Sequence, residues 1–302
     1  MQTDRPFIGI LLMLGFCVLA PLGDSIAKLL GGQVGLGQLL LTRFLVQALI
    51  LIPVVLWAGR RLWPPQGTLT LIFVRTLLHI VGIGLMFTSL RYLPLADALA
   101  IAFVMPFIML LLGKVFLNEE VGPHRLIACA IGFVGTLLVI QPNFAEVGWP
   151  ALLPLGVAVI FAFFMLVTRK IAKLLDPIDL QAISGIQATL ILLPALWLFS
   201  DHPEVTRFDA TSQIIVLLLA LGVLGTLAHL MMTWSLRFAP ASTLAPMQYL
   251  EIPFGTIIGW IVFKDLPNGL AALGILITIA AGLYIILRER RLSQSEGDPL
   301  AE

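Results

Sequence analysis

The chain has 302 residues, of which 59% are apolar and only 12% are charged, and its mean hydropathy is +1.03. So few charged side chains cannot cover a water-soluble protein of this length, and lipid is therefore the expected solvent. The formal net charge of +1 gives no reason to expect nucleic acid as a partner. The two cysteines, Cys17 and Cys129, have no second ligand at metal or disulfide spacing, so no metal or cofactor is expected.

Charges, prolines and glycines divide the chain into ten apolar stretches, each about as long as a helix that crosses a bilayer. In chain order these stretches are residues 7–28, 37–56, 68–90, 95–117, 124–140, 149–168, 180–199, 213–234, 241–263 and 268–287. The first stretch resembles a signal peptide, but Pro21 would follow the cleavage site and the residues before it are barely basic. An uncleaved first helix is expected, and the predicted fold class is an all-α membrane protein with ten transmembrane helices.

Basic residues are distributed unevenly between the two sets of predicted loops and span ends. One set, which includes both termini, holds most of them, whereas the other set holds only Lys28, Arg91, Arg207 and Lys264. Because basic residues are retained in the cytoplasm, both termini are predicted to be cytoplasmic in a multi-pass protein of the inner membrane.

Short sequences recur in the same order in the two halves of the chain. The sequence Ile-Ala-Lys-Leu-Leu at 26–30 recurs at 171–175, and Ser-Leu-Arg-Tyr at 89–92 recurs as Ser-Leu-Arg-Phe at 235–238. A separation of five spans, an odd number, inverts the second copy relative to the membrane, and inverted bundles can expose a central site to each side alternately. We therefore predict five-helix repeats at 1–142 and 143–290 and a disordered cytoplasmic tail at 291–302. Transport is favoured over catalysis, although pores also contain repeats.

Several motifs carry a resemblance to a known family. They are Ala98-Leu99-Ala100 through Pro106, Gly113 and Phe116-Leu117-Asn118-Glu119-Glu120, a second copy at Ala245-Pro246, Pro253, Gly259 and Phe263-Lys264-Asp265, and Arg43-Phe44 in the second span. Together they resemble EamA-like members of the drug/metabolite transporter superfamily. Asp265 stands where a glutamate is common, and one proline is shifted by one position between the halves. The resemblance implies a ten-helix secondary carrier and leaves its substrate open, because the family handles amino acids, nucleotide-like compounds, amines, drugs and vitamins such as riboflavin.

Ionisable side chains inside a bilayer cost about 2.5–3.5 kcal/mol each, so those in this chain are expected to face a cavity or a partner. Glu251 and His79 fall near the middle of their spans, where carriers of this kind hold substrate. Glu251 is predicted to bind a cationic group or a coupling proton, and His79 can change charge near neutral pH. The alternative for both residues is a structural hydrogen bond between helices.

Prolines point to irregular helices at the same depth. Pro246 and Pro253 flank Gln248, Tyr249 and Glu251, and each proline removes a backbone donor. Irregular backbone in a membrane is tolerated against protein or a wet cavity, so these three side chains are predicted to face the transport path. Met105 and Pro106 occupy the equivalent level of the fourth span, where a simple kink is the alternative.

Two further pairs of polar residues lie away from the middle of the membrane. Asp24 and Arg43, in the outer third, are predicted to form an ion pair that serves as a gate or as an architectural clamp. Arg75 and His229, in the inner third, are predicted to bridge an anionic substrate; the alternative is that Arg75 reaches the cytoplasmic headgroups and His229 forms a local hydrogen bond.

These features favour a secondary active transporter that moves a small polar organic metabolite, such as an amino acid, a related compound or a vitamin, by alternating access. Protons are the candidate coupling ion, since no Walker A sequence is present to bind ATP. A monomer and a homodimer are both open. The alternatives are a channel and a membrane-embedded enzyme, although no His-Glu-x-x-His or Gly-x-Ser-x-Gly sequence supports catalysis.

Overall fold

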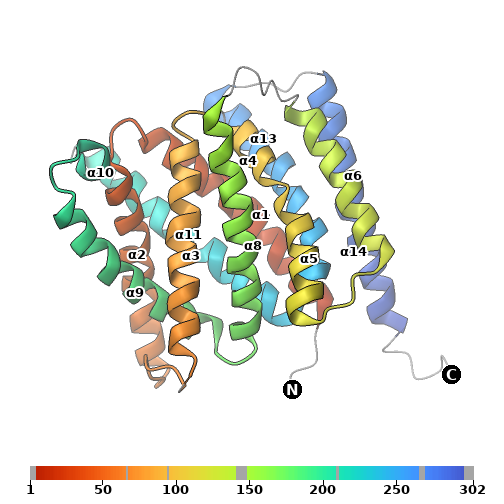
Figure 1. Ribbon diagram of the computed structural model, residues 1–302, viewed down its shortest axis with the longest axis horizontal. Coiled ribbons are helices and arrows are strands. Elements are labelled where there is room, and N and C mark those ends of the chain that lie inside the picture. The colour runs from red at the N-terminus through yellow and green to blue at the C-terminus, as the bar shows by residue number, and fades with distance from the viewer. Residues whose placement is uncertain are drawn as a thin grey trace.

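The computed structural model describes residues 5–65, 67–93, 95–140, 148–208, 211–264 and 269–295. Throughout these residues the regular structure is helical, apart from an isolated antiparallel bridge between Val34 and Phe208. The all-α prediction is confirmed for this part of the chain. The helices form one bundle, in which α1 (Pro6–Leu30) begins and α14 (Gly269–Ser295) ends at the same edge, the lower one in Figure 1.

Each predicted apolar stretch coincides with one helix or with a broken helix. The remaining elements are α2 (Leu36–Trp57), α3 (Leu69–Ser89), α4 (Leu95–Ala102), α5 (Met105–Leu117), α6 (Pro123–Ile140), η1 (Trp149–Ala151), α8 (Leu152–Ala172), α9 (Pro177–Leu198), α10 (Pro203–Thr206), α11 (Ser212–Phe238), α12 (Ala241–Leu244), η2 (Ala245–Leu250) and α13 (Glu251–Phe263). The helix boundaries differ from the predicted ones by a few residues, because length and hydropathy locate a span but not its caps.

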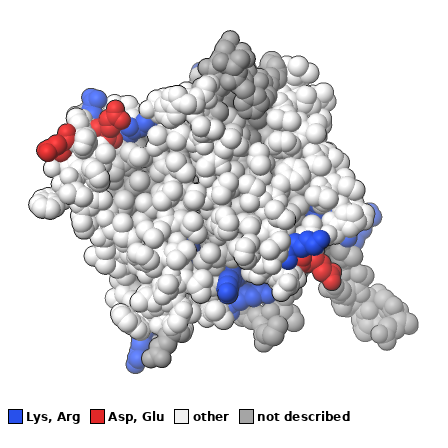
Figure 2. Space-filling model, viewed as in Figure 1, with Lys and Arg blue, Asp and Glu red and all other residues white. Residues whose placement is uncertain are grey.

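Six of these helices, α1, α2, α3, α8, α9 and α11, are long and apolar enough to cross a membrane, and shorter apolar helices lie at 105–117, 123–138 and 272–288. Figure 2 shows that, on the face it presents, acidic and basic side chains gather towards the upper and lower edges and leave a broad uncharged region between them. Many large apolar side chains are exposed, including those of Leu49, Leu190 and Val216. Such a surface belongs in lipid, and the chain is therefore a multi-pass membrane protein.

The main packing pairs each join a helix of the first half of the chain to one of the second half. Helix α1 packs along α11, α2 along α9, α3 along α8, and α6 along α14. The core consequently lies between the two halves. A site at this junction is lined by both of them.

Two of the predicted spans are broken near mid-height. In the first, α4 ends at Ala102 and α5 begins at Met105, with Pro106 at its start. In the second, α12 leads into the 3₁₀ helix η2, which has Pro246 at its start, and α13 follows from Glu251. Proline supplies no backbone donor, so Pro106 and Pro246 each interrupt the helical hydrogen-bond pattern at a break.

The second halves of the two broken spans have the same form. Both α5 and α13 contain 13 residues, and each ends on a residue in the left-handed conformation, Asn118 with φ 52° and Lys264 with φ 64°. Pro253, the remaining predicted break, is the third residue of α13 and does not interrupt that helix. A proline in the first turn is tolerated because the donors there have no partner within the helix.

Some predicted features lie outside the described residues, namely the boundary at 142/143, residues 296–302 of the tail, and Asp265. Helix α14 continues to Ser295, five residues into the segment predicted as a disordered tail. The sequence there, Arg-Leu-Ser-Gln-Ser at 291–295, contains neither glycine nor proline, so the helix can continue beyond the apolar stretch.

Candidate functional site

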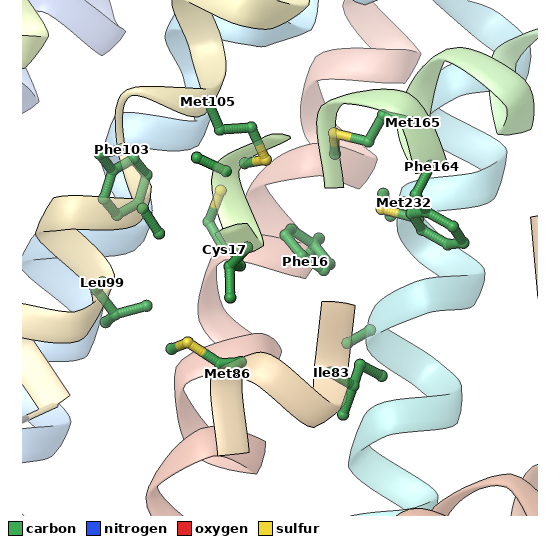
Figure 3. Packing of buried hydrophobic residues seen from close by; sticks show 14 of the residues in the cluster. Phe16, Cys17, Ile83, Met86, Leu99, Phe103, Met105, Phe164, Met165 and Met232 are labelled. Atoms are coloured by element: carbon green, nitrogen blue, oxygen red, sulfur yellow. The ribbon is translucent and has the colours of Figure 1, made fainter. Parts of the chain in front are cut away.

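A partly open cavity of about 810 Å³, its mouth included, lies between the two halves of the bundle. Most of its lining is apolar and comes from Phe16, Leu19, Ala20, Gly23, Ile83, Met86, Phe87, Leu99, Ala102, Phe103, Met105, Val157, Phe161, Met165, Leu221, Gly225 and Ala228. Figure 3 shows four of these side chains, Phe16, Met86, Phe103 and Met105, gathered from different elements around a common space.

The cavity lies at mid-height and towards the upper edge of the bundle. Helices α1 and α3 rise from the lower edge, and their lining residues begin at Phe16 and Ile83, past the lower turns of each helix. Helix α11 descends, and its lining residues end at His229, more than two turns before its lower end. Below them the bundle is filled by buried apolar side chains, among them Met13 and Leu236.

Four polar side chains line the cavity, and two of them are the carboxylates of Asp24 and Glu251. Glu251 opens α13 directly after the irregular backbone of η2, and only 7% of the residue is exposed. The two carboxylates are close enough to interact electrostatically. Neither makes an ion pair within 4.0 Å in the described part of the chain, so both are available to a ligand.

The other two polar lining residues, Arg43 and His229, contact each other and contribute nitrogen atoms rather than carboxylates. The Nη2 of Arg43 lies 2.7 Å from His229 Nδ1 and donates to the carbonyl of Gly225 at 3.0 Å, while Nη1 donates to Gln47 Oε1 at 3.3 Å. A Cβ atom on Gly225 would lie 2.7 Å from the Cζ of Arg43, so only glycine admits the guanidinium at this position. The guanidinium is therefore fixed at the cavity wall.

The predicted ion pair between Asp24 and Arg43 does not form as a direct contact between these described residues. Both line the cavity and they interact electrostatically, but the guanidinium is bonded to Gln47, Gly225 and His229 instead. These partners take up to three of the five N–H donors of Arg43, and the carboxylate of Asp24, which also lines the cavity, takes none of them within the distance of an ion pair.

His79 is fully buried but does not line the cavity. Its ring stacks on Phe164 with centroids 4.5 Å apart, meets the edge of Phe44 at 5.0 Å, and lies 4.4 Å from the ring of His229. Both of its ring nitrogens lack a hydrogen-bond partner among the described residues. Glu251 and His79 are thus not brought together, and the imidazole that shares the cavity with Glu251 is that of His229.

Arg75 is also fully buried, and its guanidinium donates to residues other than His229. Its Nε donates to Thr168 Oγ1 at 2.8 Å, Nη1 to Ser184 Oγ at 2.9 Å, and Nη2 to Thr233 Oγ1 at 3.4 Å. Its guanidinium also lies 4.6 Å above the ring of Phe164. These contacts tie α3 to α8, α9 and α11 behind the cavity.

Sequence reasoning missed the polar chain that joins the two arginines. Gln47 Nε2 donates to the backbone carbonyl of Gln181 at 2.7 Å and to its Oε1 at 3.1 Å, and Gln181 Nε2 donates to Thr233 Oγ1 at 3.0 Å. Thr233 also accepts from Arg75, so the chain is continuous from Arg43 to Arg75. Glutamine and threonine carry no charge, and only their unusual depth within apolar stretches could have marked them.

Gln248 and Tyr249 support the broken helices rather than line the cavity. The amide Nε2 of Gln248 lies 3.1 Å from Met109 Sδ and 3.3 Å from Met165 Sδ. The hydroxyl of Tyr249 donates to the carbonyl of Phe103, at 3.2 Å, in the turn between α4 and α5, and the two rings lie 5.5 Å apart. The two breaks are therefore bonded to each other, and Met105 and Glu251, which follow them, both reach the cavity.

Fold and site together define a class: a multi-pass helical membrane protein with a partly open cavity between its two halves. The sequence model of the EamA-like transporter family matches this chain twice, at residues 7–141 and 148–288. The chain belongs to the EamA-like transporter family.

Individual relatives agree with this assignment. The chain is similar to a riboflavin transporter of Rhizobium johnstonii, with 29% identity over 219 residues that cover 72% of this chain and 70% of the relative. It is also similar to an S-adenosylmethionine uptake transporter of Rickettsia bellii, with 26% identity over 268 residues and 89% of each chain covered. A protein of known crystal structure shares the fold, with a TM-score of 0.73 at 19% identity over 95% of this chain and 98% of that one. The chain is therefore a membrane transporter of metabolites.

Proposed function

We propose that this protein is a secondary active transporter that carries a small polar organic metabolite across the inner membrane by alternating access. The observation that carries the proposal is the cavity at the two helix breaks, which presents Asp24 and Glu251 on an apolar wall together with Arg43 and His229. Ionisable groups are expensive at membrane depth, and four of them around one cavity are expected to serve a ligand.

The proposed architecture is ten crossings in two inverted five-helix repeats. Three features support it: the double match to the family, the pairing of helices between halves, and the equal forms of α5 and α13. In this arrangement Met105 and Glu251 hold corresponding positions, each as the first residue after a break. The lower edge, where α1 begins and α14 ends, is proposed to be cytoplasmic because the basic set of predicted loops lies on the side of the termini.

The site residues have complementary roles in this proposal. Asp24 and Glu251 bind a cationic group of the substrate or a coupling proton, and the Arg43–His229 pair binds a carboxylate or carbonyl oxygen. Phenylalanine and methionine side chains hold an apolar or ring portion, as thioethers and aromatic rings do. His79 and Arg75 act only through His229 and Thr233, since neither reaches the cavity.

The substrate is proposed to be an amino acid, a related compound, or a vitamin such as riboflavin. The relatives named as transporters of riboflavin and of S-adenosylmethionine support a metabolite that combines a flat ring with polar groups. Protons are proposed as the coupling ion because two carboxylates in one cavity can share or exchange them.

Uptake into proteoliposomes tests the function. Purified protein is reconstituted, and radiolabelled riboflavin, S-adenosylmethionine and amino acids are offered in turn, with protein-free liposomes as the control. Saturable uptake that is accelerated by unlabelled substrate on the far side is expected for a carrier that alternates. Flux that rises linearly without saturation would instead establish a channel, and the proposal would be withdrawn.

A further inference from the structure

The lower ends of four helices meet at a single buried carboxylate, that of Glu119, outside the cavity. Its Oε1 accepts from the backbone N–H of Ala241 at 3.0 Å, and its Oε2 accepts from that of Ser242 at 2.8 Å. The same carboxylate lies 3.6 Å from the Nε of Arg169, and the side chains of Glu119 and Arg169 are only 10% and 5% exposed. Glu119 thus joins the end of α5 to the start of α12.

Local sequence builds this contact. Asn118 ends α5 in the left-handed conformation, which turns the chain back so that Glu119 lies over the last turns of α5. Gly113 provides the space for this carboxylate, because a Cβ atom on Gly113 would lie 3.1 Å from Glu119 Oε2. Pro240 directly precedes α12, and its ring restricts the backbone conformation at the start of this helix.

Neighbouring cations extend the contact to α8 and α11. Arg169, in the last turn of α8, also donates from Nη1 to the carbonyls of Leu236 at 2.7 Å and Arg237 at 3.2 Å, where α11 ends. Arg125, near the start of α6, donates to the carbonyl of Glu120 at 2.9 Å and to Ser242 Oγ at 3.1 Å. Both broken spans are therefore anchored at their lower ends to the same group of side chains.

We propose that Glu119 is the latch that closes the lower end of the transport path in this conformation. The cavity lies towards the upper edge, the core beneath it is packed, and Glu119 connects the two broken spans at the closed end. When the carboxylate releases Ala241, Ser242 and Arg169, α12 separates from the end of α5 and the site becomes accessible from below. This inference rests on the proposed alternating access.

The energetics suit a reversible latch. Hydrogen bonds to a charged group are stronger than neutral ones, and a carboxylate that loses three partners at once shifts a two-state equilibrium strongly. Glu119→Gln keeps the shape but replaces one acceptor oxygen by a donor that faces a backbone N–H. The variant is expected to move the population towards the state that is open below by about tenfold, the factor that one such bond supplies.

Thiol labelling tests the latch without knowledge of the substrate. Cys17 and Cys129 are replaced by alanine, and Ala102→Cys places a reporter in the cavity wall. A membrane-impermeant thiol reagent is then applied to right-side-out and inside-out vesicles. In the otherwise unchanged protein the reporter is expected to react faster from the upper side.

The comparison is between Glu119→Gln and Glu120→Gln, a neighbouring exposed carboxylate whose side chain takes no part in the latch. We expect about tenfold faster labelling from the lower side in Glu119→Gln and unchanged labelling in Glu120→Gln. Equal lower-side rates in the two variants would overturn the latch. Arg169→Gln repeats the test if Glu119→Gln is not inserted, with an increase expected and an unchanged rate again counting against the proposal.

The two proposals fail separately. If the protein without the Ala102→Cys substitution shows no saturable uptake, the proposed transport function is wrong, whatever the labelling shows. If uptake is saturable but Glu119→Gln does not change the rate of labelling from the lower side, only the latch proposal is excluded, and the Glu119 contact is a static connection between helices.

Discussion

Arg43 and His229 lie 2.7 Å apart, Nη2 to Nδ1, where the second and eighth predicted spans meet the cavity. The short contact assigns the imidazole Nδ1 as acceptor, because guanidinium only donates. His229 Nε2, which lacks a partner among the described residues, then carries the proton. These hydrogen bonds fix both side chains at the cavity wall.

Arg43→Lys is predicted to lower the initial rate of uptake at least about tenfold. An ammonium is a point donor on a flexible chain and cannot hold the planar set of bonds to Gln47, Gly225 and His229. Transport assays in proteoliposomes with equal amounts of inserted protein measure the rate. Arg207→Lys, on the loop after α10, is the matched control, and a rate for Arg43→Lys equal to that of the control would exclude a role for the guanidinium geometry.

Glu251→Gln is predicted to abolish either substrate binding or proton coupling while leaving the protein inserted. The amide keeps the shape of the side chain but cannot accept a proton or balance a cation in a low-dielectric cavity. Uptake is measured with and without an imposed pH gradient. Glu204→Gln on α10, which lies away from the cavity, controls for loss of an acidic residue as such. Full gradient-driven transport by Glu251→Gln would remove this carboxylate from the mechanism.

Gln47→Leu tests the positioning role of the polar chain behind Arg43. The substitution removes the acceptor for Arg43 Nη1 and the donor to Gln181, so the guanidinium loses one of its fixed directions. We predict a several-fold rise in KM with a smaller change in maximal rate, since binding geometry is lost but the carboxylates remain. A merely structural residue would instead reduce the amount of folded protein and leave KM as it was.

Arg75→Met is predicted to lower thermal stability in detergent by several degrees, with a smaller effect on KM than Gln47→Leu. The charged hydrogen bonds to Thr168, Ser184 and Thr233 join four helices, and each such bond contributes about 1.5–3 kcal/mol. A thermal melt followed by the loss of monodisperse protein gives the shift. An unchanged melting temperature would contradict the structural role of the guanidinium.

The sequence was sufficient to place the helices, because apolar length and punctuation follow directly from the thickness of a bilayer. It also located the broken spans through Pro106 and Pro246, each of which removes a backbone donor, but proline alone does not decide where a helix breaks, since Pro21, Pro53 and Pro194 lie inside continuous helices. It did not show which face of each helix meets the cavity. On α3, His79 points into a cluster of aromatic rings while Ile83, one turn later, lines the site.

Helix rotation explains that difference. Residues one turn apart share a broad face, and small differences in packing decide which of them reaches a narrow cavity. Depth estimates therefore grouped Glu251 with His79 and did not show that His229 is the imidazole that shares the cavity with Glu251. The contacts of Glu119 could not be predicted from the sequence either, because two of its three partners are backbone N–H groups, which nearly every residue has.

Gly225→Ala offers a test of the site that changes no polar group. Its Cβ would lie 2.7 Å from Arg43 Cζ, so the guanidinium must leave the wall and give up its bonds to the Gly225 carbonyl and His229. We predict a loss of transport similar to that of Arg43→Lys, with little loss of inserted protein because alanine favours the helix. Gly84→Ala is the matched control, since a Cβ there meets only Leu40 Cδ1 at 3.6 Å, an ordinary contact. If both variants transport normally, the position of Arg43 at the cavity wall is not required for transport, and the substrate must be held chiefly by Asp24 and Glu251.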